Sequence, residues 1–466
     1  MGGDTPLPHP GDKSGMSLAS GNPPHRLRVP GTRRSGRAPS CECRIPGPRA
    51  RGGVPSATLA TLRPLAAGSA RRDFFLAPQA ASSPPPHRLG APGSGTRRRA
   101  HERCASGSWT ASSPGAGGVA VSDDLLSVRD LVVSFRTERG TVRALFGVSF
   151  SLAPGETLGL VGESGCGKTV TALSLLKLLP SPPAAIEGGR VFFRGRDLLP
   201  LPEDRMCEVR GKEISMIFQE PMTSLNPVLP IGDQVAEVFT AHRACGRTEA
   251  AARAVDWLRR VKMPDAERRA REYPHQLSGG MRQRAMIAMA LALEPALLIA
   301  DEPTTALDVT IQAQILSLLQ EMREQQGMAI LLITHDLGVV SEFADRVAIM
   351  YLGRIVEIAK TGDLFADPVH PYTQGLLRSL PGTRTGEKRL PSIPGMVPDL
   401  DAIPPGCPFA DRCPFRQEAR DRFRAGETGK DELAVCDRVP PPLEEYAPGH
   451  FAACHYQRKV RKGEGG

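Results

Sequence analysis

The residues best suited to chemistry form one octapeptide, Gly162-Glu163-Ser164-Gly165-Cys166-Gly167-Lys168-Thr169, which fits the pattern G-x-x-x-x-G-K-[ST]. In this pattern the glycines let backbone N–H groups turn toward phosphate oxygens. Lys168 is then placed to reach the β- and γ-phosphates, and the hydroxyl of Thr169 is placed to bind Mg²⁺. We therefore expect a binding site for the phosphates of a nucleoside triphosphate. Its expected members are Gly162, Ser164, Gly165, Gly167, Lys168 and Thr169.

The second half of such a metal site is expected where a neighbouring buried strand ends. The run Leu297-Leu298-Ile299-Ala300 is followed by Asp301 and Glu302. Asp301 is expected to hold Mg²⁺ through water, and Glu302 to polarise the attacking water. His335, after another apolar run, is a candidate sensor of the γ-phosphate. Each of these residues has a simpler interpretation as a strand-end cap or turn residue.

Elements that position these residues can be read from the apolar pattern. A short apolar strand, 156–161, precedes the octapeptide, and a helix is expected over 170–179. The runs 296–300 and 329–333 lack polar alternation, as parallel strands buried on both faces do. Ile311, Ile315, Leu318, Leu319 and Met322 fall on one helical face between them. Strands alternating with helices predict an α/β fold with a largely parallel sheet. Upstream, residues 125–128, 131–135 and 142–152 are expected to be strands.

The charge of the chain is concentrated in its first part. Residues 1–120 hold 17 Lys and Arg against 5 Asp and Glu, so the remaining residues carry a balance of −3 although the whole chain carries +9. Pro and Gly make up 35 of these 120 residues, a composition that cannot bury enough apolar surface to offset ordering entropy. We expect a disordered basic tail. Its interpretation as an arm for anionic lipid or nucleic acid, as an organelle transit peptide, or as an extension without function stays open.

The sequence also indicates whether the chain crosses a membrane and in which compartment it is found. No apolar run approaches the 18 or more residues of a membrane-spanning helix, and the first 30 residues contain no apolar block of a secretory signal. A cytosolic, reducing location is the expectation.

Leu277-Ser278-Gly279-Gly280-Met281 follows the phosphate-binding pattern by about 115 residues and resembles the signature motif of ABC-transporter ATPases, often LSGGQ. The resemblance implies that Ser278, Gly279 and Gly280 bind the γ-phosphate of ATP held by a partner chain. Met281 stands where Gln is usual, beyond the residues that contact phosphate.

Other positions continue this resemblance. Gln219 resembles the Q-loop glutamine, which contacts Mg²⁺ and the reacting water, and Ala306-Leu307-Asp308 resembles the D-loop, whose Asp308 lies at the nucleotide. His335 resembles the switch histidine. Phe135 resembles the aromatic residue that stacks on adenine, although a core position fits a single strand Phe equally well.

Within this family, residues 219–227 and 370–377 look like the oligopeptide/dipeptide (and nickel) importer branch, and the resemblance covers about 125–458. It implies a P-loop ABC-type ATPase domain over 121–385, with an antiparallel β subdomain and a helical subdomain at about 220–285, then a C-terminal extension over 386–466. It further implies a peripheral ATPase on the cytoplasmic face of the cell membrane. Its partners would be two membrane permease subunits, a second ATPase subunit, identical or related, and indirectly an extracytoplasmic substrate-binding protein.

The alternative class of protein is a soluble ABC-type ATPase that acts on nucleic acid or ribosomes. Members that act on chromosomes insert a long coiled coil before the signature motif, and ribosome-type members carry two cassettes. This chain has one phosphate-binding pattern and a gap of a single subdomain. We therefore expect no nucleic-acid partner.

Four of the ten cysteines are patterned, namely Cys407, Cys413, Cys436 and Cys454 in a Pro-rich segment with weak secondary-structure signals. Their spacing lacks C-x₂-C, so it leaves zinc and free thiols open. The importer ATPases carry a similar Cys-Pro-Phe, Arg-Cys-Pro and Cys-His arrangement, implicated in a [4Fe–4S] cluster in some members. The resemblance therefore favours iron–sulfur.

Overall fold

The structure is a computed structural model that describes residues 124–220, 224–242, 245–305, 307–380, 393–427 and 433–457. The predicted tail 1–120 lies outside the described residues, as do Pro221, Met222 and Thr223 of the importer motif and Ala306 of the D-loop motif. Among the described residues, no helix is both long and apolar enough to cross a membrane.

An eight-stranded sheet carries the phosphate-binding octapeptide, with strand order β11-β12-β10-β9-β3-β8-β7-β6. The strands β9, β3, β8, β7 and β6 run parallel to one another, and β10, β12 and β11 continue the sheet in antiparallel pairing. All residues of β3, β7 and β8 are buried, which explains their unbroken apolar sequences. The bounds are β3 Thr157–Val161, β6 Ile214–Ile217, β7 Leu297–Asp301, β8 Ala329–Thr334, β9 Arg346–Tyr351, β10 Arg354–Lys360, β11 Glu444–Ala447 and β12 His450–Ala452.

Helices connect the parallel strands. The octapeptide leads from β3 into α1 (Lys168–Leu175), and α8 (Val309–Gln326) connects β7 to β8. Helix α8 buries Ile315, Leu318, Leu319 and Met322, the face predicted from their spacing. Gly327 ends α8 with φ +64°, a conformation that costs glycine no steric penalty. Shorter helices follow β8 and β10, namely α9 Leu337–Phe343, α10 Thr361–Ala366 and α11 Pro371–Arg378.

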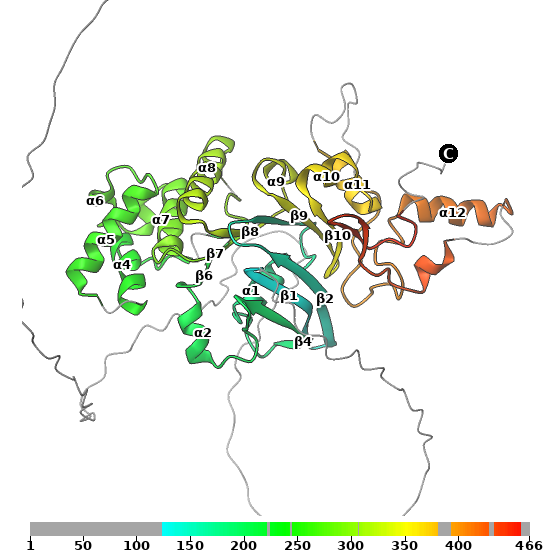
Figure 1. Cartoon of the computed structure of the whole chain (residues 1–466), viewed down its shortest axis with the longest axis horizontal. Coiled ribbons are helices and arrows are strands. Elements are labelled where there is room, and N and C mark those ends of the chain that lie inside the picture. Colours follow the sequence, from blue (N-terminus) through cyan, green and yellow to red (C-terminus); the bar gives the residue numbers. More distant parts are fainter. Residues whose placement is uncertain are drawn as a thin grey trace, which may run out of the picture. The chain divides into compact units, whose positions relative to one another are not determined.

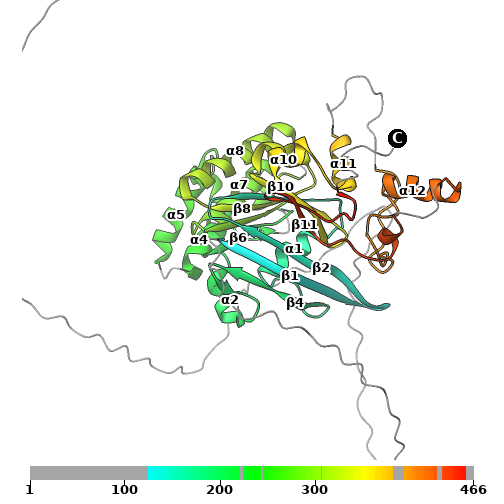
Figure 2. The ribbon, with the colours of Figure 1, turned by 45° about the vertical axis from the view of Figure 1, so that its right-hand side comes forward.

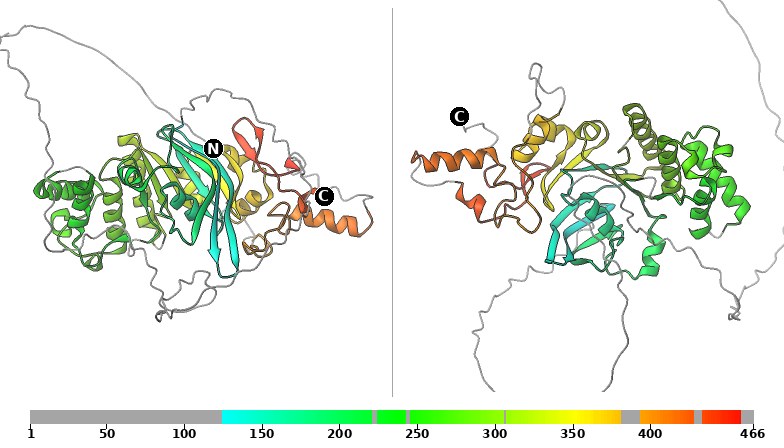
Figure 3. Two further views of the ribbon diagram at one scale, coloured as in Figure 1. Left: turned by 90° about the horizontal axis from the view of Figure 1, so that it is seen from below. Right: turned by 180° about the vertical axis from the view of Figure 1, so that it is seen from behind.

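A second sheet, of order β2-β1-β4-β5, is antiparallel. One apolar cluster joins it to α1 and the larger sheet, with Leu145, Leu160, Leu175 and Val191 among its fully buried members; Figures 2 and 3 show the two sheets side by side. The separate strands predicted over 125–128 and 131–135 are wrong, because they form one strand, β1. The pairing shifts around Asp130, whose φ is +49° and whose N–H donates to the Ser149 hydroxyl at 2.8 Å, so β1 continues through an irregularity. The bounds are β1 Leu126–Thr137, β2 Gly140–Leu152, β4 Ala184–Phe193, β5 Arg196–Asp197, and α2 Glu203–Val209 after them.

Between β6 and β7 the described residues form several helices and no strand. They form α4 Ile231–His242, α5 Arg247–Arg260, α6 Ala266–Arg269, the 3₁₀ turn η1 Pro274–Gln276, and α7 Gly279–Leu291. These helices pack on one another around Phe239, Trp257 and Ile287 (Figure 1). Ion pairs hold Glu272 to Arg268 and Arg269 beside this cluster.

The C-terminal segment, defined as residues 393–427 and 433–457, contains α12 Pro414–Arg424, the 3₁₀ turn η2 Ala434–Asp437, and strands β11 and β12. It is attached by strand pairing, since β12 hydrogen-bonds to β10. It is also attached by packing, since Phe409 is 2% exposed within the cluster of Tyr351 and Tyr372. Anchoring to the sheet, rather than an apolar core of its own, therefore orders this Pro-rich segment.

Candidate functional site

The octapeptide forms a tight loop between β3 and α1. Gly165 and Gly167 have φ +80° and +106°, a region that L side chains rarely adopt. A Cβ at Gly162 would meet the Met350 carbonyl oxygen at 2.2 Å, so only glycine fits there. The loop and the N-terminus of α1 thus present backbone N–H groups as a phosphate cradle requires.

Lys168 lies where this loop closes. Its side chain is 6% exposed, and its Nζ donates to the carbonyl oxygens of Gly162 at 2.8 Å and Glu163 at 3.1 Å. Its third contact is to the Cys166 sulfur at 3.8 Å, and a buried ammonium whose printed hydrogen-bond partners are all uncharged attracts an anion strongly. The geometry fits a triphosphate. Ser164 and Gly165 on the same loop are exposed.

Asp301 and Thr169 form the candidate magnesium site. Asp301 ends β7 and is 1% exposed, and its Oδ1 has no hydrogen-bond partner among the described residues. Burial raises the pKa of Asp301 to about 6, against the lowering effect of its hydrogen bond with Thr169. A buried carboxylate oxygen without a partner, beside a hydroxyl, matches the oxygen ligands that Mg²⁺ takes. The donor set therefore fits the ion.

Glu302 is held by three side chains from three different segments. Its Oε2 accepts from Gln219 Nε2 at 3.0 Å and from Thr305 Oγ1 at 2.8 Å, and its Oε1 lies 3.2 Å from His335 Nδ1. Burial alone would raise the pKa of Glu302, but the bonds from Thr305 and His335 outweigh it and keep the pKa below its ordinary value. The carboxylate is thus ionised at neutral pH and can accept a proton or orient water.

The backbone fixes Glu302 as well. Its φ is +47°, and its N–H donates to the Ile333 carbonyl of β8 at 2.8 Å. A non-glycine residue in this region costs about 1–3 kcal/mol and persists where its surroundings hold it, as at functional sites. The structure therefore brings together Gln219, Asp301, Glu302 and His335, which the sequence treated as separate candidates.

The signature motif lies at the start of α7. Ser278 caps the helix by accepting from the Met281 N–H at 3.4 Å, and Asp308 caps α8 by accepting from the Ile311 N–H at 2.9 Å. A Cβ at Gly280 would meet Ile311 at 2.9 Å, so the first turns of α7 and α8 lie against each other. Ser278 and Gly279 are exposed. Among the described residues, no hydrogen bond or ion pair joins this motif to the phosphate loop.

Phe135 lies in β1, half-buried, and packs against the apolar cluster of the two sheets. This packing is what the core interpretation predicted. The adenine-stacking role stays a prediction.

Sequence reasoning missed two residues that support Glu302. Thr305 is one, and the other is Gln283, which is 2% exposed and donates from Nε2 to the Pro303 carbonyl oxygen at 2.5 Å. Gln283 therefore ties the signature helix to the residue after Glu302. A polar side chain on the otherwise apolar face of α7 was the available signal.

The four patterned cysteines lie in the C-terminal segment, and none of them forms a disulfide bond. They lie near one another, since the Cys407 N–H donates to the Cys436 carbonyl at 2.7 Å. Burial, together with the neighbouring thiols, raises the pKa of Cys407 and of Cys454 to about 12. Within the described residues, however, no three Cys, His, Asp or Glu side chains are placed to hold a metal ion. The structure therefore does not support the iron–sulfur prediction.

Comparisons with known proteins give the family. Residues 145–305 match the family model described as ABC transporter, and residues 356–419 match that of the oligopeptide/dipeptide transporter, C-terminal region. The "Probable peptide ABC transporter ATP-binding protein y4tR" of Sinorhizobium fredii is 54% identical over 340 residues, which cover 73% of this chain and 97% of that protein.

The chain belongs to the ABC transporter ATP-binding family.

Two further members of the family are similar over most of their length. The dipeptide transport ATP-binding protein DppD of Bacillus subtilis is 52% identical over 66% of this chain and 91% of its own. The oligopeptide transport ATP-binding protein OppD of the same organism is 53% identical over 62% of this chain and 82% of its own. Among solved structures, the dimeric ATP-binding cassette MJ0796 bound to ADP and Pi is similar at 27% identity and a TM-score of 0.46, over 51% of this chain and 98% of that one. The family membership agrees with the resemblance seen in the signature motif.

Proposed function

We propose that this chain hydrolyses ATP to power the import of peptides, or of related small solutes such as nickel, through a membrane ABC transporter. The observation that carries the proposal is the Glu302 carboxylate, held by Gln219, Thr305 and His335 directly after Asp301. Relatives named for peptide, dipeptide and oligopeptide transport, each more than 50% identical, supply the substrate class. The alternative of a soluble ATPase acting on nucleic acid or ribosomes is not favoured by these relatives.

In this mechanism the phosphate loop binds ATP. The Lys168 ammonium exchanges its loop carbonyls for β- and γ-phosphate oxygens, and backbone N–H groups of Gly165 and Gly167 donate to the phosphates. Thr169, Asp301 and Gln219 would hold Mg²⁺, which neutralises charge on the transferred phosphoryl group. Glu302 orients the attacking water and takes its proton, and His335 steadies the carboxylate from its other oxygen.

The exposed signature motif supports a second chain as partner. Among the described residues, the start of α7 makes no hydrogen bond to the chain's own phosphate loop. The proposal therefore assigns the N–H groups of Ser278, Gly279 and Gly280 to ATP bound by a partner ATPase, identical or related. Asp308, which caps the helix whose Ile311 lies against Gly280, would lie at this seam, and Phe135 would stack on adenine. ATP then joins the two chains, and its hydrolysis releases them.

The remaining partners follow from the same proposal. Two permease subunits would span the membrane and an extracytoplasmic protein would deliver the substrate, with this chain as a peripheral subunit on the cytoplasmic face. Residues 386–466 would form the C-terminal extension typical of the importer branch. An iron–sulfur cluster on its four cysteines is a separate hypothesis, with zinc and no metal as the alternatives, and metal analysis of the purified protein tests it.

The test is Glu302→Gln in the full chain, assembled with its permease. Loss of a general base costs about 10²- to 10⁴-fold in rate, so phosphate release should fall by that amount while ATP affinity is kept and an ATP-bound dimer accumulates. Glu324→Gln, an exposed glutamate of α8, is the matched control and should hydrolyse ATP at the normal rate. Undiminished hydrolysis by Glu302→Gln would remove the carboxylate from its role.

A further inference from the structure

Glu163, the second residue of the phosphate loop, is held by parts of the chain about 200 residues away. Its backbone N–H donates to the Tyr372 hydroxyl at 3.1 Å. Its carboxylate accepts two hydrogen bonds from Arg412, from Nη1 to Oε2 at 2.7 Å and from Nη2 to Oε1 at 3.1 Å. Its carbonyl oxygen accepts from Lys168 at 3.1 Å. One loop residue thus connects the C-terminal segment to the lysine that binds phosphate.

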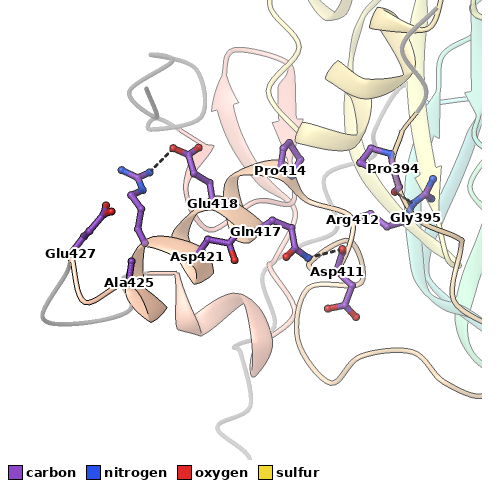
Figure 4. Close-up of a pocket in the computed structure, with 11 residues that line it drawn as sticks. Pro394, Gly395, Asp411, Arg412, Pro414, Gln417, Glu418, Asp421, Ala425 and Glu427 are labelled. Atoms are coloured by element: carbon purple, nitrogen blue, oxygen red, sulfur yellow. Dashed lines mark hydrogen bonds and ion pairs between the residues drawn. The ribbon is translucent and has the colours of Figure 1, made fainter.

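Arg412 is rigidly placed to make this contact. Its side chain is only 5% exposed, its Nε donates to the Pro394 carbonyl at 3.2 Å and its Nη1 to the Tyr351 hydroxyl at 3.4 Å. The guanidinium also lies over the rings of Tyr351 and Phe409, at 5.8 and 5.9 Å from their centroids. Figure 4 shows Arg412 in the turn before α12, beside Gly395 and Asp411. A buried arginine that donates two hydrogen bonds to one carboxylate fixes the orientation of that carboxylate as well as its distance.

Tyr372 is equally fixed. It is fully buried, and its N–H donates at 3.1 Å to Nδ1 of His370, which caps α11. Burial lowers the pKa of His370 to about 4, so this imidazole stays neutral and can accept the bond. The motif around residues 370–377 therefore has a structural use at the phosphate loop.

We infer that Arg412 is a positioning residue for ATP binding: by clamping and neutralising Glu163, the C-terminal segment sets the shape and charge of the phosphate loop. The inference rests on the proposed ATPase function. Without Arg412, the Glu163 carboxylate would be left unpaired in the loop that must accept the negative charges of ATP, and like charges repel strongly at this partly buried site.

The experiment measures ATP affinity and turnover for Arg412→Met in the full chain. Methionine keeps an apolar stem over Tyr351 and Phe409 but removes the charge. We expect ATP to bind about tenfold more weakly, within the range of coupling between sites, with KM raised and kcat nearly unchanged because Glu302 is not touched. Arg420→Ala is the matched control: Arg420 pairs with Asp437 and Asp411 within the C-terminal segment and should leave ATP affinity unchanged.

Recovery of ATP affinity in a double variant distinguishes the positioning role of Arg412 from a merely structural role. In the double variant Arg412→Met with Glu163→Gln, no uncompensated carboxylate remains, so ATP affinity should recover to within about threefold of the wild type. A double variant that binds ATP as weakly as Arg412→Met alone would overturn the inference, as would an equal loss in Arg420→Ala. If Arg412→Met does not fold, Arg412→Gln, which also removes the charge, is compared with and without Glu163→Gln under the same criterion.

Lys168→Ala distinguishes failure of the proposed ATPase function from failure of the role inferred for Arg412. If it loses ATP binding while Arg412→Met keeps wild-type affinity, the ATPase function stands and the inference fails. If Lys168→Ala itself binds ATP normally, the proposed function fails.

Discussion

Glu357 of β10 offers a quantitative test of how the C-terminal segment is attached. The side chain is fully buried and accepts hydrogen bonds from the Val369 N–H at 2.8 Å, the His370 N–H at 2.9 Å and His450 Nε2 of β12 at 2.7 Å. Glu357→Ala would leave three buried donors without an acceptor. Each costs about 1–3 kcal/mol, and removal of one member of a buried pair costs about 3–5 kcal/mol. Because these contributions overlap, we expect Glu357→Ala to lower the free energy of unfolding by about 3–5 kcal/mol in total.

Hydrogen exchange gives the assay at residue level. The amides of Val369 and His370 should lose protection in Glu357→Ala, and the thermal unfolding midpoint should fall by several degrees. Glu444→Ala, on exposed β11, is the control and should change stability by no more than about 0.5 kcal/mol. If the two variants unfold alike and both amides stay protected, the buried carboxylate does not stabilise the contacts around β10 and the reasoning is refuted.

Two further predictions concern the loop and the cysteines. Gly162→Ala should weaken ATP binding at least tenfold, because its Cβ would meet the Met350 carbonyl oxygen at 2.2 Å, whereas Gly188→Ala, with nothing within 4 Å, should bind ATP normally; equal affinities in a nucleotide titration would contradict the packing. The iron–sulfur hypothesis predicts equal amounts of iron and acid-labile sulfide in anaerobically purified protein. Metal-free protein, which the placement of the thiols favours, would discard it.

The nucleotide-binding part of the fold was accessible to sequence reasoning because its signals are local. The apolar runs before Gly162, Asp301 and His335 became β3, β7 and β8, since strands buried on both faces have an unambiguous composition. The face of α8 followed from its 3.6-residue period. Such signals need only neighbouring residues.

What sequence reasoning missed depends on contacts between distant residues. The strand break expected before Leu131 did not occur, because Ser149 on β2 accommodates the left-handed Asp130. The pairs Arg412 with Glu163 and His450 with Glu357 join residues 249 and 93 positions apart. No local sequence pattern predicts either pair, because a charged side chain is expected to be solvent-exposed unless its partner is known.

The strand order of the large sheet has a consequence for how the protein is made. Strands β11 and β12, formed by residues 444–452, complete the edge next to β10, and Arg412 reaches the phosphate loop from the same late part of the chain. A ribosome that has released only the first 390 residues has therefore produced every residue that the proposal assigns to ATP but not β11, β12 or Arg412. Until residues 444–452 emerge during translation, β10 is left without its partner strand β12, and an unpaired edge of this kind can pair with a wrong strand.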